Sequence, residues 1–313
     1  MRKAALVYNP DSGGSGKRRQ ELQSAIAILR SGGVEAEIVL ADSRDHGGQE
    51  TRRAVAAGCD TVFACGGDGT INNVAEALAN TPAALAVLPM GTANALAHDL
   101  GLPLSVPAAA KAALSGTTRR ISLGKITCNG LAGVPVTRYF AVAAGVGVDA
   151  HLFYKLHNGL KKSMGMTAYY AKAWNLLLTY VMASFTAEYV ETGSSDACKM
   201  EVTELLAVRI RQFGGIVREI APGASLDRND LRLILCRTHS RLAYLAYVAR
   251  SAFGRSWNIP GIDLVYATGV RCDYCVSAVQ RNIYVQADGE LIGTLPAEIT
   301  VVPDALNLLV PKR

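Results

Sequence analysis

The first 120 residues alternate between short apolar runs and helical patterns, and this alternation limits the fold of the chain more than any other feature. Apolar runs at residues 4–8, 35–40, 61–64 and 85–88 predict strands, and the segments between them carry apolar residues at helical spacing. Strands that alternate with helices form a parallel sheet with helices on both faces. The sequence therefore predicts an α/β fold that begins with a doubly wound parallel sheet.

Three turns rich in glycine, asparagine or proline follow the predicted strands, at residues 9–17, 66–70 and 89–94. In parallel sheets, ligands bind beyond the carboxyl ends of the strands. We therefore expect the three turns to gather along one rim of the sheet and to form a binding site there.

The middle turn carries the strongest chemical signal, with the sequence Gly66-Gly67-Asp68-Gly69-Thr70 between an apolar run and a helical pattern. Glycines allow the backbone to approach a ligand closely, and the free N–H groups at a helix start attract phosphate. Asp68 would repel phosphate unless a cation bridged the two groups. The turn therefore predicts a site for a nucleotide with Mg²⁺; the alternative is a glycine-rich turn with a purely structural role.

The pattern changes after residue 120, where strands joined by short turns are predicted at residues 121–126, 138–143, 199–210, 231–236, 262–266 and 281–286. They indicate an antiparallel, strand-rich second domain. Helical patterns at residues 151–185 and 241–252 interrupt it. The most apolar part of the first, residues 166–185, predicts a core helix, with a helix that lines an apolar substrate cleft or lies at a membrane interface as the alternatives.

The composition limits the class of partner. Half of the residues are hydrophobic, which is ample for a buried core, and 32 basic against 26 acidic residues give a net charge of +6. The basic residues are scattered, without the block or aromatic interleaving of a nucleic-acid binder, so no nucleic-acid partner is expected. A mild positive charge suits anionic ligands and anionic membrane surfaces.

The first residues and the cysteines bear on the compartment. The apolar run at residues 4–8 is too short for the core of a signal peptide. The seven cysteines, an odd number lying mostly inside apolar runs, fit a reducing environment better than a disulfide framework. A cytoplasmic protein is therefore expected.

Three passages taken together resemble the catalytic family of the diacylglycerol kinases, which includes bacterial lipid kinases and sphingosine and ceramide kinases. They are Asn9-Pro10 with the glycine turn after it, the turn from Gly66 to Thr70, and Leu88-Pro89-Met90-Gly91-Thr92-Ala93-Asn94. The middle turn alone is also found in NAD kinases and phosphofructokinases. Its combination with the third passage is specific, and the likeness extends over nearly the whole chain.

The resemblance implies a nucleotide domain like that of phosphofructokinase at residues 1–120, completed by residues 299–313, and a β-rich, sandwich-like lipid-substrate domain at residues 121–298. ATP would lie in the cleft between them. The residues implied to contact the nucleotide are Asn9, Ser43, Gly66, Gly67, Asp68, Gly69, Thr70, Gly91, Thr92 and Asn94. For Asn9 and Asn94 the alternative is turn capping.

The resemblance also supplies acid–base candidates. The passage Gly145-Val146-Gly147-Val148-Asp149 is similar to one that places its Asp near the reacting groups, and Asp288-Gly289-Glu290 is similar to a terminal motif of the family. Glu290 would accept the proton of the lipid hydroxyl, and Asp288 would orient it or hold Mg²⁺. Phosphoryl transfer needs such a carboxylate, although Asp-Gly is also an ordinary hairpin turn.

The stretch from residue 221 to residue 230 resembles a passage that holds a structural Mg²⁺ in some bacterial members, through carboxylates matched here by Asp227 and Asp230. Arg228 stands where a further acid is common, and its charge would weaken the metal site or replace the metal by a salt bridge. The chain departs from its family at two other positions, Asn73 in place of Glu and Ala95 in place of Asp.

These features together predict an ATP-dependent lipid kinase that transfers the γ-phosphoryl group to a hydroxyl of diacylglycerol or of a sphingoid or ceramide-like lipid. Its partner would be a lipid at the membrane surface, reached by peripheral association, and a homo-oligomer is left open. One alternative is an NAD kinase, against which the passage from Leu88 to Asn94 argues. The other is an inactive nucleotide- or lipid-binding regulator, against which the retained Asp68, Asp149, Asp288 and Glu290 argue.

Overall fold

A computed structural model describes residues 1–10, 16–41, 47–150, 182–214, 219–253, 258–275 and 282–312. The chain divides into two compact units, one with residues 1–123, 212–216 and 302–313 and the other with residues 124–211 and 217–301. Strands β5 (Thr117–Gly130) and β14 (Glu290–Val310) contribute residues to both units. The boundaries expected from the sequence, after residues 120 and 298, lie within these same two strands.

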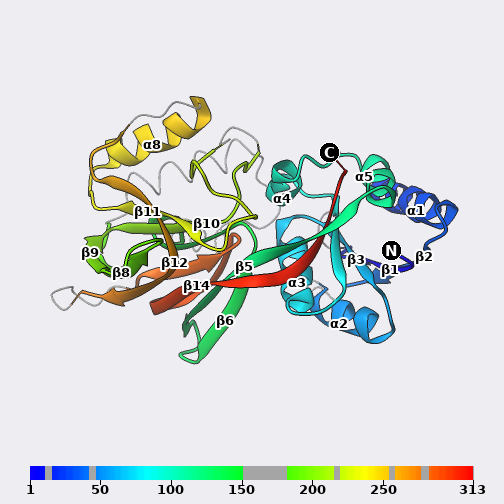
Figure 1. Cartoon of the computed structure of the whole chain (residues 1–313), viewed down its shortest axis with the longest axis horizontal. Coiled ribbons are helices and arrows are strands. Elements are labelled where there is room, and N and C mark those ends of the chain that lie inside the picture. The colour runs from blue at the N-terminus through cyan, green and yellow to red at the C-terminus, as the bar shows by residue number, and fades with distance from the viewer. Residues whose placement is uncertain are drawn as a thin grey trace. The chain divides into compact units, whose positions relative to one another are not determined.

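The first unit is built on the predicted parallel sheet, in the order β2–β1–β3–β4–β14 (Figure 1). Its strands are β1 (Lys3–Tyr8), β2 (Glu35–Leu40), β3 (Thr61–Gly66) and β4 (Ala84–Pro89). The C-terminal part of β14 pairs parallel to β4, with Asn307 opposite Ala84. The last residues of the chain thus complete the sheet formed by the first.

Helices cover both faces of this sheet, as the alternating pattern predicts. They are α1 (Gly16–Ser31), α2 (Gly48–Ala56), α3 (Asp68–Leu78), α4 (Ala95–Asp99) and α5 (Val106–Leu114). Helix α1 packs against α5, and α2 packs against α3, on opposite sides of the strands (Figure 1). Successive residues of β1 face these two layers, because Leu6 belongs to the core formed with α1 and α5 while Val7 lies beside Gly47 at the start of α2.

The second unit is the predicted antiparallel, strand-rich domain. Its strands pair in the order β13–β7–β10–β11–β12–β8–β9, and β6 pairs with β5. Their bounds are β6 Pro135–Phe140, β7 Ala143–Gly147, β8 Phe185–Glu191, β9 Ala197–Val202, β10 Glu204–Val208, β11 Leu231–Cys236, β12 Ile262–Tyr274 and β13 Tyr284–Ala287. Alternate residues of these strands form one buried core, and the predicted helix α8 (Arg241–Phe253) follows β11.

Three predicted elements differ from the structure. The strand expected at residues 138–143 is interrupted between β6 and β7, because the backbone N–H groups of Ala141, Val142 and Ala143 bond to a carboxylate. The strand expected at 199–210 is interrupted at Thr203, whose N–H and hydroxyl groups both donate to the Cys236 carbonyl. The helical stretch expected at 151–185 lies outside the described residues up to residue 181, and Phe185 begins a strand.

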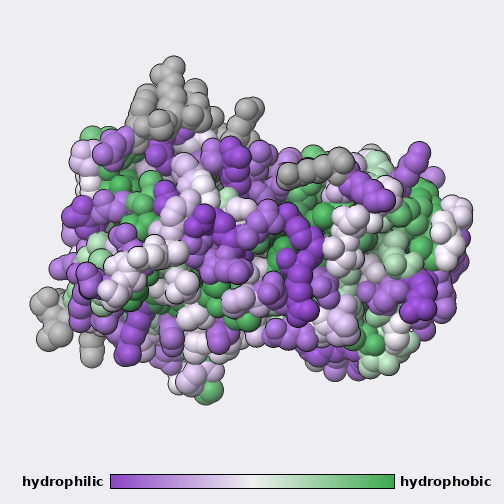
Figure 2. Space-filling model, viewed as in Figure 1, coloured by the Kyte–Doolittle hydropathy of each residue, from purple (hydrophilic) through white to green (hydrophobic). Residues whose placement is uncertain are grey.

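Among the described residues, no helix combines the length and apolar character that crossing a membrane requires. Figure 2 shows hydrophilic residues over most of the visible face, with apolar residues in small groups between them.

Candidate active site

The middle and third turns of the first unit are joined by Asp68. Its Oδ2 atom accepts a hydrogen bond from the Asn94 N–H at 3.0 Å, and its Oδ1 atom accepts one from the Ala95 N–H at 2.8 Å. The two turns are adjacent because β3 and β4 pair in register, with Gly66 opposite Pro89. The expectation that these two turns share one rim is confirmed, and the Asp68 carboxylate fixes their spacing.

Glycine is required in both turns because their backbones touch. A Cβ atom on Gly91 would lie 2.5 Å from the Cα atom of Gly67, and one on Gly67 would lie 3.3 Å from the Cα atom of Gly91. Gly66 meets the Thr70 side chain in the same way, at 2.5 Å from its Oγ1 atom. Because these glycines carry no side chains, a phosphate could approach the free N–H groups at the start of α3.

We expect the substitution Gly91→Ala to weaken ATP binding by about 10-fold or more, because the added methyl group forces the two turns apart and spoils the aim of their N–H groups. Gly67→Ala, with the longer contact, should have a smaller effect. Titration of both variants with ATP, followed by calorimetry, measures the difference. An unchanged affinity of Gly91→Ala for ATP would show that the contact between the two turns is not needed for nucleotide binding.

Asn94 uses its side chain inside its own turn. Its Oδ1 atom accepts a hydrogen bond from the Gly91 N–H, and its Nδ2 atom donates to the Gly91 carbonyl, each at 2.9 Å, with the Asn94 backbone at a φ of 50°. This is the turn-capping alternative, and a nucleotide contact by Asn94 stays a prediction. Asn9 is buried at the end of β1 and Thr92 is exposed, while Ser43 and residues 11–15 lie outside the described residues.

In the second unit, Asp288 holds the hairpin between β13 and β14. Its carboxylate accepts hydrogen bonds from the N–H groups of Ala141, Val142 and Ala143, each at 2.9 Å. Asp288 and Gly289 both have positive φ values, 46° and 82°, as the Asp-Gly hairpin requires. The backbone of Asp288 therefore forms an ordinary Asp-Gly hairpin turn. The Asp288 carboxylate joins this turn to the start of β7.

Gln286 connects Asp149 to the same hairpin. Its Nε2 atom donates to Asp149 Oδ2 at 2.8 Å, and its Oε1 atom accepts from the Gly289 N–H at 2.9 Å. The structure thus links Asp149 to the hairpin that carries Asp288 and Glu290. Gln286, only 3% exposed, was not identified from the sequence; its one signal is an amide within the apolar residues of β13.

Glu204 is a second residue that the sequence did not reveal. Its Oε2 atom accepts hydrogen bonds from the N–H groups of Val148 and Asp149, which brings its carboxyl group beside that of Asp149. Burial raises the pKa of Glu204 well above its usual range, and the nearby Asp149 charge raises it further. Burial also raises the pKa of Asp149, while hydrogen bonds from Glu204 and Gln286 act in the opposite direction.

Glu290 is in a more open environment. Its Oε2 atom lies 3.4 Å from Arg138 Nη2, and its side chain is 36% exposed. A carboxylate with this access can receive a proton from a bound hydroxyl.

A small apolar cavity of about 160 Å³ ends on Asp149 and Glu204. The rest of its wall is aliphatic or aromatic and comes from β10, β11, α8 and their connections: Val148, Leu206, Ile220, Ile234, Cys236, Tyr244, Tyr247, Val248 and Ile262. No lysine, arginine or histidine is among these lining residues. The cavity therefore fits an uncharged, apolar group that carries a hydroxyl at one end.

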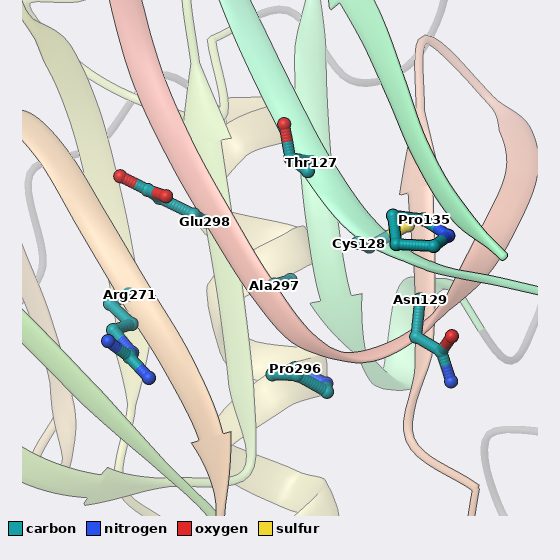
Figure 3. Close-up of a pocket in the computed structure, with 8 residues that line it drawn as sticks. All are labelled: Thr127, Cys128, Asn129, Pro135, Arg271, Pro296, Ala297 and Glu298. Atoms are coloured by element: carbon teal, nitrogen blue, oxygen red, sulfur yellow. The ribbon is translucent and has the colours of Figure 1, made fainter. Parts of the chain in front are cut away.

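A larger opening of about 470 Å³ lies on β5, β6, β12 and β14 (Figure 3). None of the predicted site residues lines it. The polar ends of Arg271, Glu298 and Asn129 do not converge on one point in Figure 3, and Arg271 bonds to Asp273 at 2.8 Å. This opening lacks the convergent polar groups of a binding site.

The loop predicted to hold a structural Mg²⁺ is occupied by arginine side chains instead. Asp230 is buried, and its two carboxylate oxygens each accept a hydrogen bond from Arg228 at 2.6 Å. Arg209, with no exposed surface, donates to the carbonyl oxygens of Leu226, Arg228 and Asp230. Burial lowers the pKa of Arg209 to about 10, which leaves it charged at neutral pH.

These oxygens do not fit a metal ion in addition. A Mg²⁺ ion needs oxygen ligands without competing cations, and here two guanidinium groups already use the Asp230 carboxylate and the loop carbonyls. At Asp230, a salt bridge from Arg228 therefore takes the place of the metal, which is one of the two outcomes expected from the sequence. A metal contact by Asp227 stays a prediction.

A parallel sheet with a Gly-Gly-Asp-Gly-Thr turn, followed by an antiparallel unit that carries carboxylates, defines the class of kinases to which NAD kinases and lipid kinases belong. Residues 3–126 match the family "Diacylglycerol kinase catalytic domain", and residues 141–310 match "YegS C-terminal NAD kinase beta sandwich-like domain". The chain belongs to the diacylglycerol kinase catalytic-domain family and is a phosphotransferase.

Relatives extend over the full length. A diacylglycerol kinase of Mycobacterium tuberculosis (strain ATCC 25618 / H37Rv) is 31% identical over 99% of this chain and 96% of its own, and one of Bacillus subtilis (strain 168) is 28% identical over 100% and 98%. Two solved structures share the fold. A diacylglycerol kinase from Bacillus anthracis str. Sterne has a TM-score of 0.71 at 17% identity over 99% and 96% of the two chains. Yeast NADH kinase has a TM-score of 0.54 at 9% identity over 100% and 84%.

Proposed function

We propose that this protein is an ATP-dependent lipid kinase that phosphorylates a hydroxyl of diacylglycerol or of a sphingoid or ceramide-like lipid. The observation that carries the proposal is the apolar cavity that ends on Asp149 and Glu204. An acyl chain suits its aliphatic and tyrosine walls. NAD⁺ does not, because the pyrophosphate of NAD⁺ is anionic and the charged groups of this cavity are carboxyls.

The first unit would hold the nucleotide. Phosphate would bind at the N-terminus of α3, against Gly66 and Gly67. Asp68 lies in the same turn, and its carboxylate has about four acceptor positions, of which two accept hydrogen bonds from backbone N–H groups. The remaining positions fit Mg²⁺, which would neutralise the charge on the transferred phosphoryl group.

The second unit would act on the lipid. Glu290 is proposed to accept the proton of the acceptor hydroxyl, held in place by Arg138. Asp149 would orient that hydroxyl from the polar end of the cavity, and Asp288 would fix the hairpin on which Glu290 lies. This division supports catalysis by positioning and charge neutralisation, which is what phosphoryl transfer needs.

Peripheral association with the membrane is part of the proposal. On α8, Tyr244, Tyr247 and Val248 line the cavity, and Val248 (44%) and Leu242 (77%) are exposed to solvent. Exposed apolar residues on a helix beside an acyl-chain cavity suit insertion at a membrane interface. Basic surface residues would add about 1 kcal/mol each on an anionic membrane.

The test is a transfer assay with γ-labelled ATP and Mg²⁺ against diacylglycerol, sphingosine, ceramide and NAD⁺. We expect label in at least one lipid and none in NAD⁺. Label in NAD⁺ alone would overturn the proposal in favour of an NAD kinase. Nucleotide and lipid binding without transfer to any acceptor would identify the inactive regulator.

A further inference from the structure

Two carboxyl groups meet at the polar end of the apolar cavity, and only one of them has a proposed function. Asp149 follows β7, and Glu204 begins β10. The two strands are antiparallel neighbours with Glu204 opposite Gly147, so the Glu204 side chain reaches the backbone just after β7. The contact between the two carboxyl groups is therefore built into the register of the sheet.

The two carboxyl groups fit against β7 because the strand has glycine at the two positions that they approach, Gly145 and Gly147. A Cβ atom on Gly145 would lie 2.1 Å from Asp149 Oδ2, and one on Gly147 would lie 2.9 Å from Glu204 Oε2. Gly147 also has a φ of 114°, which a side chain would strain. The two glycines of this passage thus make room for one carboxyl group each.

The burial of two neighbouring carboxyl groups favours one shared proton. Backbone N–H groups of Val148 and Asp149 donate to Glu204, while the Ala150 N–H donates to Asp149 Oδ1 at 2.5 Å and Gln286 donates to Oδ2 at 2.8 Å. Two adjacent carboxylates in a buried site repel each other, so one of them keeps a proton. Burial raises the pKa of both groups, and the neighbouring Asp149 charge raises that of Glu204 further, so we assign the proton to Glu204.

We propose that Glu204 is a positioning residue of this kinase, which holds a proton in a hydrogen bond to Asp149 and so keeps the Asp149 carboxylate charged and directed at the acceptor hydroxyl. The proposal rests on the lipid kinase function proposed above and assigns to Glu204 a role that it performs through Asp149. Three donors, from Glu204, Gln286 and the Ala150 backbone, then fix the Asp149 carboxylate at the end of the cavity.

The groups facing Glu204 from the neighbouring elements do not compete for this proton. Cys236 lies opposite Glu204 on β11, and Tyr244 faces it from α8. Burial raises the pKa of both, so each stays neutral over the range in which carboxyl groups titrate. The Tyr244 hydroxyl is also bonded to Thr203 Oγ1 at 2.7 Å. A change in activity caused by loss of the shared proton can therefore be assigned to the carboxyl pair.

The sign of the pH dependence follows directly. As the pH rises through the raised pKa of Glu204, the shared proton leaves, Asp149 loses a donor, and two negative charges face each other. Activity should therefore fall on the alkaline side. Glu204→Gln keeps both a donor and an acceptor but cannot titrate, so this alkaline fall should disappear. Glu204→Ala removes the donor at every pH.

The experiment compares wild type, Glu204→Gln, Glu204→Ala and the exposed control Glu298→Gln, using the full chain, γ-labelled ATP and diacylglycerol in mixed micelles from pH ~6 to ~10. We expect Glu204→Ala to lose about 10- to 100-fold in kcat/KM for the lipid, the effect of one charge-assisted hydrogen bond. Its KM for ATP should not change. Glu204→Gln should stay within about 3-fold of wild type at neutral pH and lack the alkaline fall.

Two results would overturn the proposal: the same alkaline fall in Glu204→Gln as in wild type, or a loss in Glu204→Ala no greater than its loss of folded protein in a thermal melt. Infrared difference spectra of the free protein give an independent measurement, since the carbonyl band of a protonated Glu204 should be present at neutral pH in wild type and absent in Glu204→Gln. A wild type that carries this band but labels no lipid would contradict the proposed function and leave the proton assignment standing. A missing band would contradict the proton assignment itself.

Discussion

Replacing Arg209 by methionine is expected to lower the free energy of unfolding by about 3–5 kcal/mol. Arg209 has no exposed surface, and its guanidinium donates to the carbonyl oxygens of Leu226, Arg228 and Asp230 at 3.3, 2.9 and 2.5 Å. Methionine fills a similar volume but donates no hydrogen bond. The substitution therefore leaves buried carbonyl oxygens without these donors, which is more costly than losing the bonds themselves.

Denaturant unfolding measures this effect, and Arg211→Met is the matched control. Arg211 lies two residues further on, its side chain is 65% exposed, and it pairs with Glu219 at 3.1 Å. An exposed ion pair contributes about 0–1 kcal/mol, so the control should change little. A loss in Arg209→Met as small as in the control would show that the loop does not depend on its buried guanidinium.

The same experiment distinguishes a guanidinium from a metal ion. If Arg209 and Arg228 supply the positive charge of this loop, neither EDTA nor added Mg²⁺ should move the unfolding midpoint of the wild type. A ligand that binds only the folded state stabilises it in proportion to the logarithm of its concentration. A midpoint that rises with Mg²⁺ and is lost on mutation of Asp227 would restore the metal site predicted from the sequence.

Local patterns were sufficient to predict the first unit. The apolar runs that became β1, β3 and β4 are buried on both faces, as strands of a covered parallel sheet are, and helical spacing marked the segments between them. Because ligands bind beyond the carboxyl ends of parallel strands, the three turns after these strands were expected along one rim, and the structure joins the second and third of them there. The family resemblance alone indicated that residues 299–313 complete the first unit, and their pairing with β4 was not predicted, because no local pattern states which strand lies beside which.

The second unit shows where the sequence was insufficient. Glu204 begins an apolar strand and Gln286 lies within one, and the importance of each depends on Asp149, which is 55 and 137 residues away in the chain. The sequence predicts a helix up to Phe185, where the structure begins a strand, because a largely apolar run precedes this residue and apolar character alone does not distinguish a helix from a strand. Arg228 was recognised as a departure from the family, but the buried Arg209 beside it was not, since burial of a charge is a property of the fold.

Replacing Glu290 by glutamine is expected to lower kcat for the lipid acceptor by about 10²- to 10⁴-fold, with little change in the KM for ATP. Glutamine has nearly the same shape as glutamate but cannot accept a proton from a hydroxyl. Single-turnover transfer from γ-labelled ATP measures the chemical step directly. The matched control is Glu298→Gln, which makes the same change at an exposed position of the same strand and should leave transfer unchanged.

The outcome assigns the proton acceptor because the second unit offers two carboxylates in different environments. Glu290 is 36% exposed beside Arg138, whereas Asp149 is held by Gln286 and Glu204 in hydrogen bonds that leave it little freedom to move. A fixed carboxylate suits orientation of the hydroxyl, so Asp149→Asn should raise the KM for the lipid as well as lower kcat. Full activity in Glu290→Gln, together with a loss confined to kcat in Asp149→Asn, would contradict the assignment and transfer the role of base to Asp149.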